Sequence, residues 1–449
     1  MNVSVVGTGY VGLVTGVCLA SIGHRVVCVD VDRKRVNTVN DGVSPFLEPG
    51  LEPLLKQVLE DGAFKCVHPD DWEDIGDVTF LAVATPSGPE GQDQTFIRAA
   101  AKQLGERMVT GQYHVAVVKS TVVPGTTREV VWDALKASSD VRREDLGVCS
   151  NPEFLREGSA VDDFMVPDRI VIGSVDRRCG DVVAELYSRF DCPVVRTSLE
   201  NAEAIKYASN ALLSTLISFS NEMAAICETI PGADVREVMQ GVHEDRRLSV
   251  LVDGEKQRPG ILSYLWAGCG FGGSCLPKDV NALRHHAQRS GMETGVLDGV
   301  MKTNEARAQR FCDLAAVELG DLNGKVCGLL GLTFKAGTDD LRDSPALRIS
   351  QVLQAAGATV RGYDPAIPEG TEIPGVEVFG SAESCALKAD CVMICTAWED
   401  FRALDWDRLV THLTTPVVVD GRDLLDPGTV PEGCTYLVLG RGYSSEEAY

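Results

Sequence analysis

The sequence contains no apolar run that approaches the ~20 residues needed to cross a bilayer. It begins MNVSVV, a strand-like stretch without the basic segment or the cleavage site of a signal peptide. From these absences we expect a soluble protein of the cytoplasm that has no membrane partner.

Basic residues and clustered metal ligands are also scarce. The 42 Lys and Arg residues are outnumbered by 65 Asp and Glu residues, which gives a formal net charge of -23. A protein that binds a phosphate backbone needs a basic surface, so nucleic acid is not an expected partner. The 15 cysteines include no C-x-x-C pair, and no His cluster has metal-site spacing. Most cysteines lie in apolar stretches such as VVCV at residues 26–29, so we expect reduced core thiols and no metal.

At 449 residues the chain is longer than one hydrophobic core usually serves, so two or three domains are expected. Short apolar or β-branched runs alternate with helical patterns over roughly the first 195 residues, which is typical of a doubly wound parallel sheet. These runs are Val3 to Val6, Arg25 to Asp30, Val78 to Ala82, Val115 to Lys119 and Arg169 to Ile172. The alternation restarts after about residue 324. Strands are expected there near Val326 to Leu332, Thr359 to Tyr363, Cys391 to Thr396 and Val417 to Val419.

One long helical pattern separates these two regions. Residues 200–228 contain no Gly or Pro to interrupt it. We therefore predict an α/β fold with two doubly wound Rossmann-like domains joined by a long central helix, which also serves as an oligomer interface. Segment 250–262 mixes charge, Gly and Pro, and we expect a surface loop there.

A glycine-rich segment, GTGYVG at residues 7–12, follows the first expected strand and opens a helix. Its glycines allow a tight turn and let the backbone approach a pyrophosphate at the helix N-terminus. Asp30 ends the next strand 18 residues after Gly12, where a carboxylate can bind a ribose 2′-hydroxyl. This acid favours NAD over NADP, even though Arg33, Lys34 and Arg35 lie close by. The expected NAD contacts are Gly7, Gly9, Tyr10, Val11, Gly12, Asp30 and Arg35.

The most informative stretch is GFGGSCLPKD at residues 270–279. Pro277 suits the first position of a helix, so Cys275 is expected just before a helix N-terminus. The helix dipole and nearby Lys278 lower the pKa of a thiol at that place, which makes it reactive. The glycines leave room beside the sulfur for a substrate carbon, and Asp279 returns to the same side to handle protons or water.

On the long helix, Lys206 and Asn210 are four residues apart and share a face. Together they can offer a cation and an amide to one oxygen, and their apolar neighbours make a solvated polar face the weaker interpretation. Three further segments follow strand ends, where a doubly wound sheet binds ligands: 84–86, 119–126 and 151–158.

These segments together resemble the UDP-glucose and GDP-mannose dehydrogenase family from residue 1 to about residue 400. The most specific motifs are NPEFLREG at 151–158, GFGGSCLPKD at 270–279 and FKAGTDDLR at 334–342. The resemblance implies an NAD-binding domain at 1–199, a helical linker and dimerisation domain carrying the cysteine at 200–310, and a nucleotide-sugar (UDP)-binding domain at 311–449. It implies an enzyme that oxidises the C6 alcohol of a nucleotide sugar to a carboxylate, as a homodimer or larger homo-oligomer.

The resemblance also implies residue roles. Cys275 would form a thiohemiacetal and then a thioester with C6, because one hydride transfer cannot turn an alcohol into an acid. Oxyanions would be stabilised by Lys206 and Asn210, and the hydrolytic water and protons would be handled by Thr121, Glu157 and Asp279. Further cofactor contacts would be Thr85, Thr121, Glu157, Lys278 and Arg342. Substrate contacts would be Glu153, Phe154, Leu155, Lys206, Asn210, Tyr264, Gly272, Lys335 and, from the neighbouring subunit, Arg247.

The identity of the sugar nucleotide stays open between alternatives. The segment 167–173 favours UDP-glucose, whereas 85–87 and 336–338 are closer to the GDP-mannose branch, and TDP-glucose is a further option. Ser274 disfavours N-acetylated sugars, since members that act on them usually carry His there. Loop 250–262 and Trp266 depart from the family pattern. Two other interpretations are a two-electron β-hydroxyacid-type dehydrogenase and a catalytically inactive cofactor-binding protein.

Overall fold

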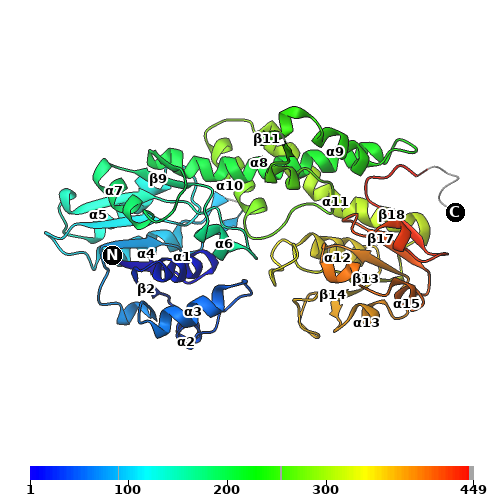
Figure 1. Ribbon diagram of the computed structural model, residues 1–449, viewed down its shortest axis with the longest axis horizontal. Helices are drawn as coiled ribbons and strands as arrows, with labels where there is room; N and C mark the ends of the chain where they lie inside the picture. The colour runs from blue at the N-terminus through cyan, green and yellow to red at the C-terminus, as the bar shows by residue number, and fades with distance from the viewer. Residues whose placement is uncertain (89–90, 253–254, 444–449) are drawn as a thin grey trace. The chain divides into compact units, whose positions relative to one another are not determined.

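The computed structural model describes residues 1–88, 91–252 and 255–443, and the chain divides into two units, Met1–Ser209 and Asn210–Tyr449. Figure 1 shows a sheet covered by helices in each of them. The long helix α8 (Leu199–Cys227) begins in the first unit and continues into the second. Among the described residues, no helix is both long and apolar enough to span a membrane.

The first unit contains an eight-stranded sheet in the order β10-β9-β8-β7-β4-β1-β2-β3. All neighbouring strands pair in parallel except β8 and β9, which pair antiparallel. The strands are β1 (Asn2–Val6), β2 (Arg25–Val29), β3 (Phe64–Val67), β4 (Val78–Leu81), β7 (His114–Val118), β8 (Leu146–Ser150), β9 (Ile170–Ser174) and β10 (Val194–Thr197). The helices are α1 (Tyr10–Ser21), α2 (Arg33–Asn40), α3 (Leu51–Glu60), α4 (Thr95–Gly105), α5 (Trp132–Ser138), α6 (Ala160–Met165), α7 (Arg177–Leu186) and the first part of α8.

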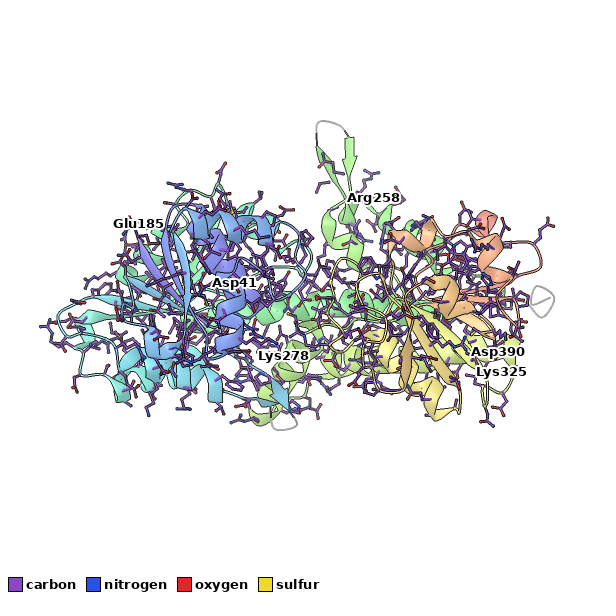
Figure 2. All side chains as sticks on the ribbon, turned by 90° about the horizontal axis from the view of Figure 1, so that it is seen from below. Asp41, Glu185, Arg258, Lys278, Lys325 and Asp390 are labelled. Carbon is purple, nitrogen blue, oxygen red and sulfur yellow. The ribbon has the colours of Figure 1, made fainter. Side chains whose placement is uncertain are left out.

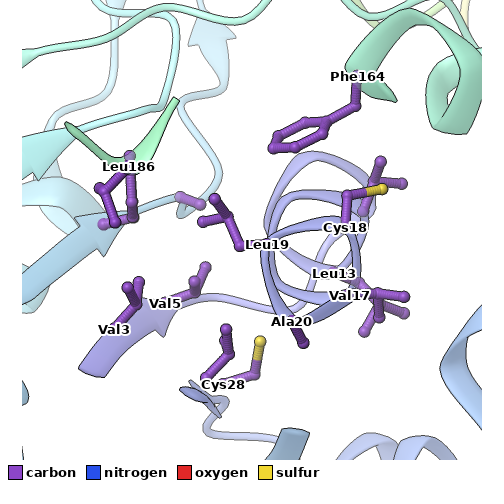
Figure 3. Packing of buried hydrophobic residues seen from close by; sticks show 14 of the residues in the cluster. Val3, Val5, Leu13, Val17, Cys18, Leu19, Ala20, Cys28, Phe164 and Leu186 are labelled. Atoms are coloured by element: carbon purple, nitrogen blue, oxygen red, sulfur yellow. The ribbon is translucent and has the colours of Figure 1, made fainter. Parts of the chain in front are cut away.

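Helices bury both faces of this sheet. Successive side chains of a strand point to opposite faces, so one strand contributes to two cores. Val3 and Val5 of β1 belong to the core that α1, α3, α6 and α7 complete, and Figure 3 shows Val5 near Leu19 of α1. Val6 of the same strand belongs to a second core, to which α4 and α5 contribute. The doubly wound arrangement predicted from the sequence is therefore confirmed in this unit.

The second unit begins with the rest of α8 and a group of helices. These are α9 (Val235–His243), α10 (Leu276–Arg289) and α11 (Gly295–Leu319). Between α9 and α10 lie an antiparallel pair, β11 (Val250–Val252) and β12 (Glu255–Gln257), and a 3-10 helix at Gly260–Tyr264. The loop expected at 250–262 is thus partly regular structure, because the short strands satisfy each other's backbone hydrogen bonds.

A six-stranded, fully parallel sheet forms the rest of this unit, in the order β15-β14-β13-β16-β17-β18. Its strands are β13 (Val326–Leu330), β14 (Thr359–Tyr363), β15 (Val376–Val378), β16 (Cys391–Ile394), β17 (Val417–Asp420) and β18 (Thr435–Val438). Its helices are α12 (Pro345–Ala355), α13 (Ala382–Ala386), α14 (Glu399–Arg402) and α15 (Trp406–Val410). Lys325 and Asp390, which precede β13 and β16, form an ion pair at 3.5 Å (Figure 2).

Agreement with the sequence-based prediction is close for the fold class and less so for individual strands. The helix expected at 200–228 spans Leu199–Cys227, and all nine expected strands are present to within a few residues. In the two large sheets five strands were not foreseen, β3, β8, β10, β15 and β18, and neither were the short pairs β5–β6 and β11–β12. The expectation of a purely parallel first sheet was wrong for the β8–β9 pair, because an apolar run identifies a strand but carries no information about its direction.

Candidate active site

The glycine turn lies where β1 meets α1, and steric contacts explain two of its glycines. Gly7 has a φ of +100°, and a Cβ there would lie 2.6 Å from the backbone oxygen of Ala82. A Cβ on Gly12 would lie 2.0 Å from the carbonyl oxygen of Gly7. Apart from its two chain neighbours, no described residue has an atom within 4 Å of the place where a Cβ on Gly9 would be. Gly9 is the N-cap of α1, so the open space lies at a helix N-terminus, where a pyrophosphate is favoured.

Asp30 follows β2, and its carboxylate binds the glycine turn through hydrogen bonds. One of its carboxylate oxygens accepts from the Thr8 backbone N–H at 2.8 Å and from the Thr8 hydroxyl at 2.6 Å. The other accepts from the Asp32 N–H at 2.9 Å, and an Nη1 of Arg35 lies 3.9 Å from the first oxygen. Thr8 was not foreseen as a partner. Since each carboxylate oxygen can accept more than one bond, the acceptor chemistry for a ribose hydroxyl remains.

Tyr10 starts α1, and its hydroxyl donates to the carboxylate of Glu48, which is buried. Glu48 also accepts from the backbone N–H groups of Gly158 and Ala160, both at 2.7 Å. Burial and the Glu48 carboxylate raise the pKa of Tyr10. Glu48 thus ties the glycine turn to the 151–158 segment, in which Glu157 is half-buried. Glu48 was not predicted as a site residue, because it lies outside every sequence motif.

The segments that carry Thr85 and Thr121 lie together because β4 and β7 are neighbouring parallel strands. The Thr85 hydroxyl donates to the backbone oxygen of Thr121 at 2.8 Å. Gln92, in the short strand β6 (Gly91–Gln92), donates to the same oxygen at 2.9 Å and accepts from the Val123 N–H at 3.0 Å. The Thr121 backbone is therefore fixed by two side chains, of which only Thr85 was foreseen.

Glu203 of α8 anchors the end of the same segment. Its carboxylate accepts from the backbone N–H groups of Gly125 at 2.7 Å and Thr127 at 2.8 Å. The side chain is 2% exposed, and burial raises its pKa to about 7. Glu203 also lay outside the sequence motifs.

Lys206 lies one helical turn further along α8 and forms a buried ion pair. Its Nζ is 2.9 Å from a carboxylate oxygen of Glu153, and both side chains are 5% exposed. The Lys206 Nζ also lies 5.5 Å from the centre of the Phe154 ring, over which Arg169 stacks at 3.9 Å. Glu153 accepts from the Leu155 N–H at 2.6 Å, which shapes this loop. The burial of Lys206 confirms that this face of α8 is not a solvated polar face.

A second buried lysine, Lys119, contributes to the field around this pair. Its Nζ donates to the Asn151 side-chain oxygen at 3.1 Å, and that oxygen also accepts from the Tyr187 hydroxyl at 2.7 Å. Burial lowers the pKa of Lys119 to about 8, opposed by the Glu153 carboxylate and reinforced by Lys206. The group therefore includes two lysines around one carboxylate, which favours an anion nearby.

Cys275 is the N-cap residue of α10, and Pro277 occupies the second helical position rather than the expected first. The thiol lies 3.5 Å from the Ser274 hydroxyl. All 15 cysteines lie in the described residues, and among them Cys275 alone is exposed. Burial holds most of the others neutral; it raises the pKa of Cys312 and Cys385 to about 12.

Asp279 lies one turn into α10 and is 1% exposed. It accepts from the Asn210 side-chain N–H at 2.6 Å, and the Lys278 Nζ lies 2.5 Å from its other oxygen (Lys278 is labelled in Figure 2). Asn210 is therefore joined to the helix that Cys275 begins. A buried carboxylate with an amide and an ammonium donor is fixed in orientation, which proton handling requires.

The 334–342 motif packs against the cysteine loop. The Gly273 N–H donates to the backbone oxygen of Arg342 at 3.0 Å, and a Cβ on Gly272 would lie 2.2 Å from the Asp343 oxygen. The Lys335 Nζ lies 5.8 Å from the centre of the Phe334 ring. The Arg342 side chain is mostly exposed and pairs with Asp340 at 2.7 Å.

Three other expected residues lie further along this unit. The Arg247 side chain is 88% exposed and pairs with Asp245 at 2.5 Å. Tyr264 ends the 3-10 helix at Gly260–Tyr264. The Trp266 ring contacts His243 edge-on at 4.4 Å, so this departure from the family pattern serves local packing.

The expected site residues thus form two groups, one in each unit. The first unit holds the glycine turn, Asp30, the Thr85, Thr121 and 151–158 segments and Lys206, whereas the second holds Asn210, Cys275, Asp279 and the 334–342 motif. The turn fits a dinucleotide, since the open side of Gly9 faces a helix N-terminus. Among the described side chains, no group of three His, Cys, Asp or Glu residues is arranged to hold a metal ion.

Three family models match consecutive parts of the chain. They are described as the NAD binding domain, the central domain and the UDP binding domain of the UDP-glucose/GDP-mannose dehydrogenase family, and they match residues 1–191, 200–306 and 328–427.

Individual relatives match almost the whole chain. The UDP-glucose 6-dehydrogenase TuaD of Bacillus subtilis is 42% identical over 94% of this chain and 89% of its own length. The UDP-glucose 6-dehydrogenase AglM of Haloferax volcanii is 39% identical over 97% of this chain and 99% of its own. Among solved structures, a UDP-glucose dehydrogenase from Pyrobaculum islandicum aligns with a TM-score of 0.87 at 35% identity, covering 98% of both chains.

Proposed function

The chain belongs to the UDP-glucose/GDP-mannose dehydrogenase family, and from this premise we propose that it is an NAD-dependent UDP-glucose 6-dehydrogenase with Cys275 as the covalent nucleophile. One observation carries the role of Cys275. It is the only exposed cysteine of 15, and it stands at the N-terminus of a 14-residue helix. A helix N-terminus favours negative charge, so a thiolate is stabilised there, whereas the buried thiols stay neutral.

The first oxidation converts the C6 alcohol into an aldehyde. The glycine turn would hold NAD, which would accept a hydride in each of the two oxidations, one NAD for each. The hydroxyl proton passes to a carboxylate, and Asp279 suits this role because its neighbours Asn210 and Lys278 hold it in one orientation. Lys206 stabilises negative charge on the C6 oxygen, and its burial strengthens that interaction.

The second oxidation requires the aldehyde to be kept. The Cys275 thiol adds to C6, with its proton passing to the C6 oxygen, and forms a thiohemiacetal. The thiohemiacetal then loses its C6 hydrogen as a hydride and its hydroxyl proton, and becomes a thioester. Water attacks the thioester carbon, the C–S bond breaks, and the carboxylate leaves while the thiol is restored. Thr121 and Glu157 position that water, and the bonds from Thr85 and Gln92 fix the Thr121 backbone.

UDP-glucose is the proposed substrate because two relatives that match nearly the full chain, at 42% and 39% identity, are UDP-glucose 6-dehydrogenases, and because the 328–427 segment matches a UDP binding domain. The test measures NADH production with UDP-glucose, TDP-glucose, GDP-mannose and UDP-N-acetylglucosamine at equal concentrations. UDP-glucose should give the highest kcat/KM. A higher value for GDP-mannose would overturn the substrate assignment, and no NADH from any of them would favour an inactive protein.

We also propose a homodimer built on α8. Leu212, Phe219 and Ile226 follow one another at seven-residue spacing and are 50%, 45% and 46% exposed, so they form an apolar stripe along one side of the helix. Such a stripe supports pairing with a second copy, and Arg247, also exposed, would reach the partner's sugar. The many buried thiols among the 15 cysteines support a reducing compartment, for which we propose the cytoplasm.

A further inference from the structure

The residues that lead to Cys275 are held by buried polar side chains of two long helices. Gly268, Cys269, Phe271, Gly272 and Gly273 are all buried. Backbone groups in a buried loop must find partners, since an unpaired N–H or C=O away from water is costly. In this loop the partners come from side chains on α8 and α11.

Asn304 of α11 makes a two-point contact with Phe271. Its side-chain oxygen accepts from the Phe271 N–H at 2.8 Å, and its side-chain nitrogen donates to the Phe271 carbonyl at 3.0 Å. The loop reaches Asn304 closely because Gly270 has no side chain; a Cβ there would lie 2.5 Å from the Asn304 oxygen. Asn304 is 3% exposed, so water does not compete for these bonds.

Arg307 and Asn221 hold the start of the loop in the same way. The Arg307 Nε donates to the Gly268 carbonyl at 3.0 Å, and the Asn221 side-chain oxygen accepts from the Gly268 N–H at 2.8 Å. An Nη1 of Arg307 also donates to the Asn221 backbone oxygen at 3.3 Å, which links α11 to α8. Arg307 is 1% exposed, and its Nη2 is buried with no hydrogen-bond partner among the described residues.

Burying a guanidinium is expensive even when most of its nitrogens donate hydrogen bonds, so the burial of Arg307 calls for a benefit elsewhere. The far end of the loop is fixed too, since the Gly273 N–H donates to the Arg342 carbonyl at 3.0 Å. The backbone is therefore pinned at residues 268, 271 and 273, and Cys275 follows two residues after the last of these contacts.

We propose that Asn304, Arg307 and Asn221 are positioning residues that fix the loop at residues 268–273. The loop then holds the Cys275 sulfur where it captures the C6 aldehyde before the aldehyde leaves the enzyme. The proposal rests on the proposed function, because it needs Cys275 as the nucleophile. Its consequence is specific. Loosening the loop reduces capture of the aldehyde, so part of the substrate leaves after one oxidation.

The test uses the full-length enzyme and the Asn304→Asp variant. Aspartate keeps the size and still accepts from the Phe271 N–H, but it has no donor for the Phe271 carbonyl. Gln309→Ala is the matched control, since Gln309 is exposed on the same helix and contacts only Asp313 in the described hydrogen bonds. With limiting UDP-glucose and excess NAD, NADH yield is measured together with aldehyde trapped by hydroxylamine, and thermal unfolding is followed in parallel.

For Asn304→Asp we expect kcat to fall by roughly ten- to hundredfold, because a small misplacement of the Cys275 sulfur slows its reaction by about that factor. The KM for NAD should change little. Trapped aldehyde should accumulate, and the NADH yield per UDP-glucose should fall below that of the wild type and of Gln309→Ala. A folded variant with wild-type yield and no trapped aldehyde overturns the proposal, even if its unfolding temperature is lower. If Asn304→Asp does not fold, Arg307→Lys, which loses the planar fork but keeps the charge, decides by the same two readouts. A wild-type enzyme that itself releases aldehyde would instead refute the proposed function.

Discussion

Two alanine substitutions in the glycine turn should both weaken NAD binding but should differ in their effect on stability. Gly9 has φ -66° and ψ -175°, a conformation that alanine adopts freely, and apart from its two chain neighbours no described residue has an atom within 4 Å of the added Cβ. The N-cap position itself loses only roughly 0.5 kcal/mol on changing from Gly to Ala. Gly9→Ala should therefore fold normally. Its unfolding temperature should fall by only about 1–3 °C.

The added methyl group of Gly9→Ala lies at the N-terminus of α1, where the pyrophosphate of NAD is expected. Displacing the phosphate oxygens weakens one charge-assisted hydrogen bond by about 1.5–3 kcal/mol, which corresponds to roughly ten- to 150-fold in Kd. Isothermal titration should show this loss for NAD and no change for UDP, whose expected domain is a different one.

Gly12→Ala serves as the counterpart because its Cβ would lie 2.0 Å from the Gly7 carbonyl oxygen. The backbone must shift, so we expect a loss of stability of about 1–3 kcal/mol or more along with the loss of NAD binding. Wild-type affinity for NAD in folded Gly9→Ala would refute the placement of the cofactor. Wild-type stability of Gly12→Ala would refute the packing of the turn.

Four further predictions follow from the site. Cys275→Ser should stop turnover and leave NAD binding nearly intact in titration; full NADH yield would rule out the covalent role. Asp30→Ala should weaken NAD by more than the ~1.5–3 kcal/mol of one charge-assisted bond, because it also releases Thr8, and an equal loss for UDP would contradict the assignment. The pKa of Glu203 is raised from 4.5 to about 7, so its contribution to stability is complete below pH 4.5 and is lost as pH rises through 7. In urea unfolding, Glu203→Gln should therefore lose less stability than the wild type as the pH rises over that range. Parallel curves of unfolding free energy against pH would refute this. Mixed subunits of Cys275→Ser and Arg247→Ala should regain activity that neither has alone, whereas an active monomer in sedimentation would exclude the trans role of Arg247.

Local sequence signals predicted the parts of the molecule that depend on neighbours in the chain. The alternation of strands and helices gave both sheets, and the unbroken pattern at 200–228 gave α8. Cys275 was placed before a helix because Pro277 and the preceding glycines act within a few residues. The hairpin of β11 and β12 was not predicted, because the mixture of charge, Gly and Pro in segment 250–262 indicated a loop.

Long-range partners were not predictable in this way. Glu48 meets Tyr10 across 38 residues, Glu203 meets Gly125 across 78, and Asn304 meets Phe271 across 33. None of these acidic or amide residues stands in a motif, and their partners are backbone groups or a hydroxyl whose position only the folded chain defines. The direction of β9 was missed for the same reason, because its neighbour is chosen by the packing of the whole sheet.

The most direct test of the four-electron reaction is the amount of NADH formed from a limiting, weighed amount of UDP-glucose by the wild-type enzyme in excess NAD. Oxidation of an alcohol to a carboxylate through a thioester on Cys275 predicts two NADH for each UDP-glucose consumed, with the product recovered as the acid. One NADH for each UDP-glucose, with the product recovered as the aldehyde, would contradict the account.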